Sequence, residues 1–220
     1  SDVAAMAGKP QHALVTLILE ASRSVNYARA IYRGLSRAAR QHDIAIVGGE
    51  TACPAGNGGA LVSVTLTGIV ATRHCCLRSG GRPGDVLFVT GQLGGSLKGH
   101  HLRFEPRVAQ AAWLAGNFKP RAMMDISDGI AADLPRLAGA SGCGYQIDVQ
   151  SLPCRRGHSI TQALHDGEDY ELLFALPARN VDRLVGNWKK RFPGLPLSRI
   201  GTLTKPGILE PSLAGGWQHF

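Results

Sequence analysis

The stretch that most constrains the fold is Met-Asp-Ile-Ser-Asp-Gly-Ile at residues 124–130, which opens a helical pattern. Ile130, Leu134 and Leu137 recur at helical spacing, so the predicted helix has one apolar face that packs against a core. Ser127 is predicted to cap this helix at its N-terminus. The chain must therefore place an acidic, glycine-containing segment at the mouth of a buried helix.

Asp125 and Asp128 flank the predicted cap, three residues apart. A helix N-terminus offers unpaired N–H groups and partial positive charge, which favour phosphate oxygens. Two carboxylates at the same place supply the hard oxygen ligands that Mg²⁺ prefers. Taken alone, the plainer interpretation is that both acids only cap the helix, so the metal hypothesis depends on other parts of the chain.

The composition is that of a loop-rich α/β or α+β enzyme: 220 residues, 44% of them hydrophobic, with 28 glycines. The net charge of +8 points to anionic partners. The basic residues are scattered and aromatic residues make up only 6% of the chain, which argues against nucleic-acid binding. Phosphorylated small molecules fit this balance better.

Five cysteines form no C-x-x-C pair and leave an odd one, which argues against a zinc site or a disulfide framework and for the cytoplasm. No apolar run approaches the ~20 residues that would span a bilayer, so no membrane partner is expected. The chain starts at Ser1 within a segment that resembles functional sequence, so we expect it to be a fragment.

A second acidic position follows a predicted strand. Residues 44–47 read as a buried strand that ends at Gly48-Gly49-Glu50-Thr51. Glycines at a strand end let the backbone approach a ligand closely, and Glu50 adds a carboxylate there; a plain glycine turn is the alternative. Residues 61–70 alternate apolar residues with Ser and Thr, which predicts a half-buried strand.

Glycine and proline punctuate residues 77–85, and we place a domain junction there, between residues 1–76 and residues 77–220. Arg78 in this stretch has the chemistry to clamp a phosphate, although a lone arginine is more often a solvated surface residue. A further acidic cluster lies at residues 166–171, before a predicted strand over 170–176. Its acids, taken singly, would be turn residues.

Six motifs in order along the chain resemble the thiamine-monophosphate kinase family, which belongs with aminoimidazole ribonucleotide synthetase and selenophosphate synthetase. They are S-D-V-A-A-M at 1–6, V-G-G-E-T at 47–51, L-R-S-G-G-R-P-G-D at 77–85, M-D-I-S-D-G at 124–129, G-E-D-Y-E-L-L-F at 167–174 and G-W-Q-H-F at 216–220. The fifth and sixth motifs resemble the kinase branch in particular.

This resemblance implies an α+β fold of two domains, each a sheet packed with helices, and a homodimer formed through strands of the N-terminal domain. It also implies transfer of the γ-phosphoryl group of ATP to thiamine monophosphate, assisted by Mg²⁺. Such a reaction needs positioning and charge neutralisation more than side-chain nucleophiles. The abundance of acids without a Ser-His or Cys-His constellation agrees with that chemistry.

The resemblance also assigns roles to residues by motif match, with Tyr32 matched only by its spacing before G-G-E and Trp217 as a terminal aromatic residue. The implied Mg²⁺ ligands are Asp2, Glu50, Asp125 and Asp128. The implied ATP contacts are Tyr32, Gly49, Glu50, Arg78 and Ser127. The implied thiamine contacts are Glu168 and Trp217.

Two departures from the family pattern bear on function. Glu50 stands where the family usually has Asp, and the family's upstream G-D-D-A motif, which supplies further Mg²⁺ ligands, is absent. We therefore expect residues 1–220 alone not to turn over. The alternatives are another ATP-dependent synthetase of the same superfamily and a non-catalytic nucleotide-binding remnant.

Overall fold

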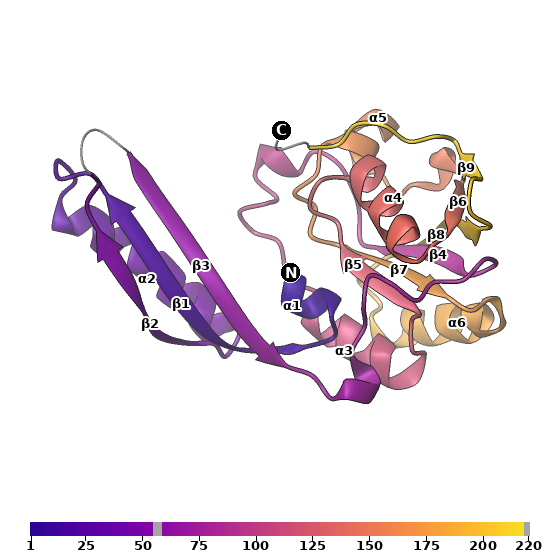
Figure 1. Cartoon of the computed structure of the whole chain (residues 1–220), viewed down its shortest axis with the longest axis horizontal. Coiled ribbons are helices and arrows are strands. Elements are labelled where there is room, and N and C mark those ends of the chain that lie inside the picture. Colours follow the sequence, from indigo (N-terminus) through magenta and orange to yellow (C-terminus); the bar gives the residue numbers. More distant parts are fainter. Residues whose placement is uncertain (55–58, 218–220) are drawn as a thin grey trace. The chain divides into compact units, whose positions relative to one another are not determined.

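The computed structural model describes residues 1–54 and 59–217, which form two compact units (Figure 1). Unit 1 combines Ser1–Gly8 with Val70–Phe220, and unit 2 is Lys9–Ile69. Unit 2 is thus inserted, in sequence, within unit 1. The domain junction that we placed between residues 76 and 77 stays a prediction.

Unit 1 is built on a six-stranded sheet with the order β5-β7-β4-β8-β6-β9. Neighbouring strands are antiparallel, except that β6 and β9 run parallel. The strands are β4 Val86–Thr90, β5 Ala122–Asp125, β6 Gly144–Ile147, β7 Leu172–Leu176, β8 Leu197–Thr204 and β9 Leu209–Glu210.

Helices cover both faces of this sheet, α4 and α5 on one face and α1, α3 and α6 on the other (Figure 1). Strand β4 shows why: Leu87 and Val89 pack with α4, whereas Val86 and Phe88 pack with α3 and α6. The helices are α1 Asp2–Ala5, α3 Val108–Asn117, α4 Ile130–Ala140, α5 Ile160–His165 and α6 Val181–Arg191. Short 3₁₀ turns are η1 Thr72–His74, η2 Ser96–Lys98, η3 Val149–Ser151 and η4 Ala178–Asn180.

Unit 2 is a three-stranded sheet with the order β2-β1-β3, formed by β1 Lys9–Leu19, β2 Ala45–Ala52 and β3 Ala60–Ile69. Helix α2, Val25–Gln41, connects β1 to the parallel strand β2, and β3 pairs with β1 in the antiparallel direction. The Ser24 hydroxyl caps α2 by accepting a hydrogen bond from the Tyr27 N–H at 3.3 Å.

The predicted burial of two strands in unit 2 is wrong. In β2, all residues except the half-buried Ile46 are exposed, and all ten residues of β3 are exposed. In β1, by contrast, the alternate residues Ala13, Val15 and Leu17 are buried. Apolar composition predicted strands correctly here, but only the central strand β1 has one covered face, whereas the side chains of the edge strands β2 and β3 stay largely exposed.

The predicted fold class, α+β with helices packed on the sheets, is confirmed. Within residues 1–54 and 59–217, no helix is both long enough and apolar enough to cross a membrane.

Candidate functional site

The acidic segment at residues 125–129 is a loop between β5 and α4, held by one buried carboxylate. Asp133 lies in the first turn of α4, fully buried, and its Oδ2 accepts hydrogen bonds from the N–H groups of Ser127 and Asp128, both at 2.9 Å. The predicted cap is therefore wrong: α4 begins at Ile130, after Gly129. The physical reason is that Gly129 has φ of +94°, which breaks the helical path, while Asp133 satisfies the N–H groups upstream of it.

Arg136, one turn further along α4, connects the loop residue Asp128 to Asp133 of the helix. Its guanidinium forms ion pairs with Asp128 and, at 2.8 Å, with Asp133. Burial raises the pKa of Asp133, while the N–H groups and Arg136 lower it. The Asp128 carboxylate thus faces an arginine of the helix that follows the loop.

Asp125 ends β5 and is buried, with 9% of its surface exposed. The Ser1 hydroxyl donates a hydrogen bond to its Oδ2 at 2.5 Å. Burial raises the pKa of Asp125 and the charge of Asp2 raises it further, while the hydrogen bond from Ser1 lowers it. Residues distant in sequence thus meet at the end of an edge strand.

The second acidic cluster pairs with the same loop through the backbone. The Glu168 N–H donates to the Ser127 carbonyl at 2.7 Å, and the Tyr170 N–H donates to the Ile126 carbonyl at 2.8 Å. Gly167 fits against this loop because it lacks a side chain: a Cβ there would lie 2.7 Å from the Ser127 oxygen. Glu168 is thereby fixed beside Ser127 and Asp128.

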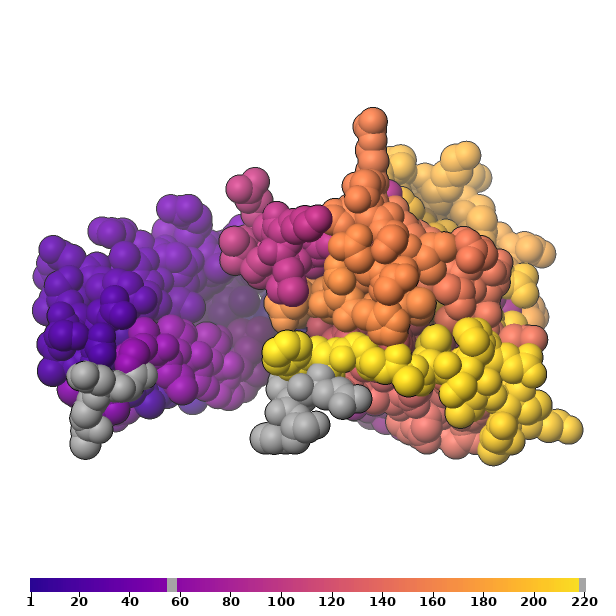
Figure 2. All heavy atoms as spheres, turned by 90° about the horizontal axis from the view of Figure 1, so that it is seen from above, coloured from indigo at the N-terminus to yellow at the C-terminus, as the bar shows by residue number. Residues whose placement is uncertain are grey.

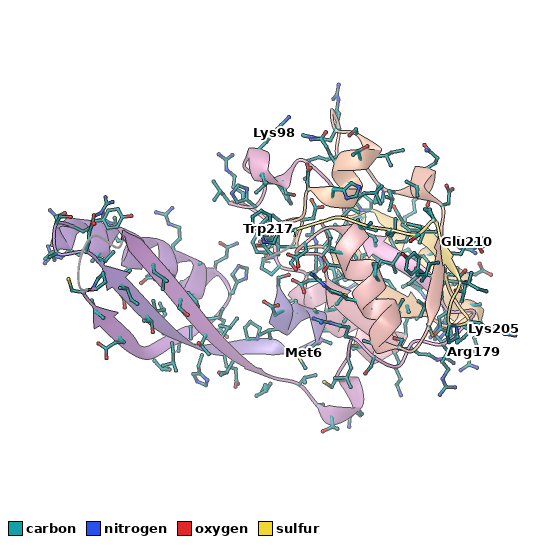
Figure 3. All side chains as sticks on the ribbon, turned by 45° about the horizontal axis from the view of Figure 1, so that its top comes forward. Met6, Lys98, Arg179, Lys205, Glu210 and Trp217 are labelled. Atoms are coloured by element: carbon teal, nitrogen blue, oxygen red, sulfur yellow. The ribbon has the colours of Figure 1, made fainter. Side chains whose placement is uncertain are left out.

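The C-terminal segment also reaches the loop. It runs across the surface of unit 1 (Figure 2), and the Trp217 N–H donates to the Asp128 carbonyl at 3.0 Å. Trp217 is 62% exposed, and it lies at the end of unit 1 opposite Arg179 and Lys205 (Figure 3). Six of the residues singled out from the sequence are therefore grouped around one loop: Asp2, Asp125, Ser127, Asp128, Glu168 and Trp217.

Arg78 belongs to the same unit but is not joined to these six residues by any described contact of its side chain. Its neighbour Leu77 accepts a hydrogen bond from the Met123 N–H at 2.8 Å, so the segment runs beside β5. The Arg78 side chain is exposed. Its phosphate contact stays a prediction.

The remaining predicted residues lie in unit 2. Tyr32 lines a groove of about 550 Å³ on α2, together with Arg29, Arg33, Ser36, Arg37 and Arg40. Glu50 lies opposite Thr16 of β1 and accepts a hydrogen bond from the Thr51 N–H at 2.9 Å.

The two glycines before Glu50 do not end a strand, contrary to our expectation, since β2 continues to Ala52. Gly49 has φ of +150°, and a Cβ there would lie 1.8 Å from the Val15 carbonyl oxygen. The close approach of the neighbouring strand is by itself enough to require a glycine here.

The described residues include no group of three or more His, Cys, Asp and Glu side chains arranged to hold a metal ion. Asp2 and Asp125 nevertheless fit Mg²⁺, which is usually held by one or two carboxylates and by substrate phosphates rather than by a protein cage. The mutual repulsion at the buried Asp125 is the charge arrangement that a cation relieves.

Sequence reasoning missed four residues that shape the site: Asp133, Arg136, Asp169 and Tyr170. The spacing of Asp133 and Arg136, at i and i+3 on the helix, was a usable signal for their ion pair. Asp169 is fully buried and accepts hydrogen bonds from the Gly94 N–H at 3.0 and 3.1 Å and from the Ser96 hydroxyl. Such a contact between distant loops leaves no local pattern in the sequence.

The models of the AIR synthase related protein family match the chain in two parts, the N-terminal domain over residues 1–70 and the C-terminal domain over residues 98–213. A thiamine-monophosphate kinase of Rhodopirellula baltica is 38% identical over 212 residues, which cover 91% of this chain and 64% of that relative. One of Aquifex aeolicus is 32% identical over 257 residues, which cover 100% of this chain and 78% of that relative.

Solved structures agree with these matches. The structure of AaThiL complexed with AMPPCP and TMP matches with a TM-score of 0.79 and 30% identity, covering 99% of this chain and 76% of that one. The chain thus spans about two thirds to four fifths of the lengths of these relatives.

Proposed function

Because the chain belongs to the thiamine-monophosphate kinase family of AIR synthase related proteins, we propose that the full-length protein transfers the γ-phosphoryl group of ATP to thiamine monophosphate. The product is thiamine diphosphate. A phosphate oxygen of thiamine monophosphate forms a bond to Pγ as the bond from Pγ to the β,γ-bridging oxygen breaks, and ADP leaves.

The observation that carries this proposal is the convergence of three segments of unit 1. The loop at 125–129, the segment at 167–170 and Trp217 are joined by backbone hydrogen bonds of 2.7 to 3.0 Å. They bring acids suited to a phosphate-bound metal beside an exposed aromatic ring. AaThiL, which has the same fold, has been solved with AMPPCP and TMP bound.

Asp2 and Asp125 would hold Mg²⁺, with Asp128 and Glu50 as the further ligands of the proposed set. Bound Mg²⁺ would neutralise the negative charge of the two phosphorylated substrates as they approach. The other roles of the chain are to bind the two substrates and to orient them. No protein base is needed, because a phosphate monoester is already an anionic nucleophile near neutral pH.

We assign ATP to Tyr32, Gly49, Glu50, Arg78 and Ser127, and thiamine monophosphate to Glu168 and Trp217. Trp217 offers an aromatic face for stacking on the thiazolium or the aminopyrimidine ring. Glu168 offers a carboxylate to the amino group or to the cationic part. Both lie next to Asp128, so the substrate would reach the metal from this side of the loop.

We further propose that the protein acts as a homodimer joined through unit 2. Val62, Val64 and Leu66 of the edge strand β3 stand opposite the buried Leu17, Val15 and Ala13 of β1, yet are 36 to 49% exposed. An exposed apolar edge strand is a site for pairing with another chain. A second copy of unit 2 presents the matching apolar row.

We assign the protein to the cytoplasm, where ATP is supplied and cysteines stay reduced. All five cysteines have free thiols in the structure. Phosphorylated small molecules, rather than nucleic acid or a membrane, are the proposed partners.

Replacement of Asp125 by Asn in the full-length protein tests the function. Turnover of thiamine monophosphate should fall by about a hundredfold or more, because a proposed Mg²⁺ ligand is lost. The measurements are ADP and thiamine diphosphate formation at saturating Mg²⁺. Asp148→Asn is the matched control, since Asp148 is exposed and caps η3, a role that Asn also performs.

Unchanged turnover in Asp125→Asn would refute the metal-ligand role. A parent protein that forms ADP only with another phosphorylated acceptor would support the synthetase alternative. A parent that binds MgATP without any turnover would support the nucleotide-binding remnant.

A further inference from the structure

Three of the four residues at 167–170 have left-handed backbone conformations. Gly167, Glu168 and Tyr170 have φ of +67°, +56° and +53°. For a bulky residue such as Tyr170 this conformation is unusual and costs free energy, and such residues cluster where the surroundings over-determine them. Here the surroundings are the hydrogen bonds from Glu168 and Tyr170 to the loop at 126–127.

The two non-glycine residues are also joined through their side chains. The Tyr170 hydroxyl donates a hydrogen bond to Oε2 of Glu168 at 2.9 Å. Burial raises the pKa of Tyr170, and the charges of Glu168, Asp125 and Asp2 raise it further, so the hydroxyl stays protonated as a donor. One oxygen of the Glu168 carboxylate is thereby fixed in place.

The Tyr170 ring is held in turn by the segment that precedes α3. Phe104 packs on it with ring centroids 4.2 Å apart. That segment is anchored at Arg107, which forms two hydrogen bonds to the buried carboxylate of Glu171, at 2.7 and 2.5 Å. Tyr170 is therefore restrained by its own strained backbone, by a packed ring and by a bond to Glu168.

We propose that Tyr170 is a positioning residue that orients the Glu168 carboxylate toward the aminopyrimidine or cationic part of thiamine monophosphate. This inference rests on the proposed function and adds a residue that contributes to substrate choice through another residue. Because Tyr170 acts on Glu168, its loss should weaken binding of thiamine monophosphate while leaving ATP binding and the transfer step nearly unchanged.

The test is Tyr170→Phe in the full-length protein, which removes the hydroxyl and keeps the ring that packs on Phe104. KM for thiamine monophosphate should rise about tenfold, the size expected for a lost hydrogen bond to a charged group. KM for ATP and kcat should stay within about twofold of the parent values. Phe104→Leu, which loosens the ring, should raise the same KM in the same direction.

A double-mutant cycle separates positioning from general damage. In a Glu168→Ala background, Tyr170→Phe should have no further effect on KM, because the group it orients is gone. Equal effects in both backgrounds, a fall in kcat or a parallel rise in KM for ATP would overturn the inference. No binding of thiamine monophosphate by the parent would instead overturn the proposed function itself, and the role of Tyr170 with it.

Discussion

Two glycine-and-acid segments look alike in the sequence but are held by different forces. In unit 1, residues 125–129 form a loop whose N–H groups are bound by the buried Asp133 carboxylate. In unit 2, residues 47–51 are part of an exposed strand, and Gly49 is pressed against the backbone of β1. Side chains fix the first segment, whereas backbone packing fixes the second.

This difference shows that a sequence motif does not indicate which interactions hold it in place. The loop of unit 1 depends on the buried carboxylate of Asp133 and its half-exposed partner Arg136, which gives the loop a defined shape and makes it sensitive to charge and pH. The strand of unit 2 depends on the absence of a Cβ at Gly49 and on the hydrogen bonds between strands. It should therefore tolerate substitutions that change charge, but lose stability on substitutions that add bulk.

The largest expected effect is that of Gly49→Ala, which tests the steric half of the comparison. The new Cβ would overlap the Val15 carbonyl, so β1 and β2 must separate, and unit 2 should lose more than about 4 kcal/mol of stability. Gly48→Ala is the matched control, because its Cβ would make only an ordinary contact of 3.5 Å with Leu14. Thermal unfolding of both variants is the measurement; similar melting temperatures would contradict the packing account.

Asp133→Ala tests the charged half of the comparison. It leaves Arg136 without one partner and the N–H groups of Ser127 and Asp128 without an acceptor, which should cost about 3 kcal/mol. Urea unfolding gives this value, and MgATP binding should weaken as the loop loosens. Asp133→Asn keeps one acceptor oxygen and should lose less; equal losses would show that the hydrogen bonds to the loop contribute little.

The smallest effect concerns pH. Burial raises the pKa of Asp169 to about 6, and Glu171 adds to this, while Ser96, Gly94 and Arg155 lower it. Because this pKa lies above the ordinary value of 3.8, the neutral acid is favoured by folding, and stability is lost as the pH rises from about 4 through about 6.

The Asn side chain of Asp169→Asn stays neutral at every pH. As the pH rises from 4.5 to 7, the free energy of unfolding of the variant should therefore increase by roughly 2 kcal/mol relative to that of the parent. Urea unfolding at both pH values checks this. A constant difference between variant and parent would mean that the Asp169 carboxylate does not titrate in this range, and it would remove the pH sensitivity that distinguishes unit 1.

The sequence predicted the types of the secondary-structure elements more readily than the interactions that hold them in place. The helical spacing of Ile130, Leu134 and Leu137 predicted a buried helix face correctly, because local periodicity reports one packed face. The onset of α4 was wrong because the capping group, Asp133, lies after the helix start rather than before it. No local rule anticipates a carboxylate that reaches back along the chain.

The grouping of site residues was predictable only through the family resemblance. Asp125 and Asp128 are neighbours in sequence, but Asp128 faces Arg136 whereas Asp125 faces Ser1 and Asp2. The sequence pattern placed Tyr170 in the strand predicted over 170–176. Its left-handed backbone is instead set by tertiary contacts, which the sequence does not display.

The insertion of unit 2 within unit 1 sets the order in which the nascent chain can acquire its parts. Ser1 and its hydrogen-bonded partner Asp125 are 124 residues apart. At a translation rate of about 5–20 residues per second, the first helix leaves the ribosome roughly ten seconds before the strand it packs against is made. Unit 2 is synthesised in that interval and can fold as a separate body, whereas the acidic site can only assemble afterwards. During biosynthesis, unit 2 and the acidic site are thus separated in time as well as in sequence.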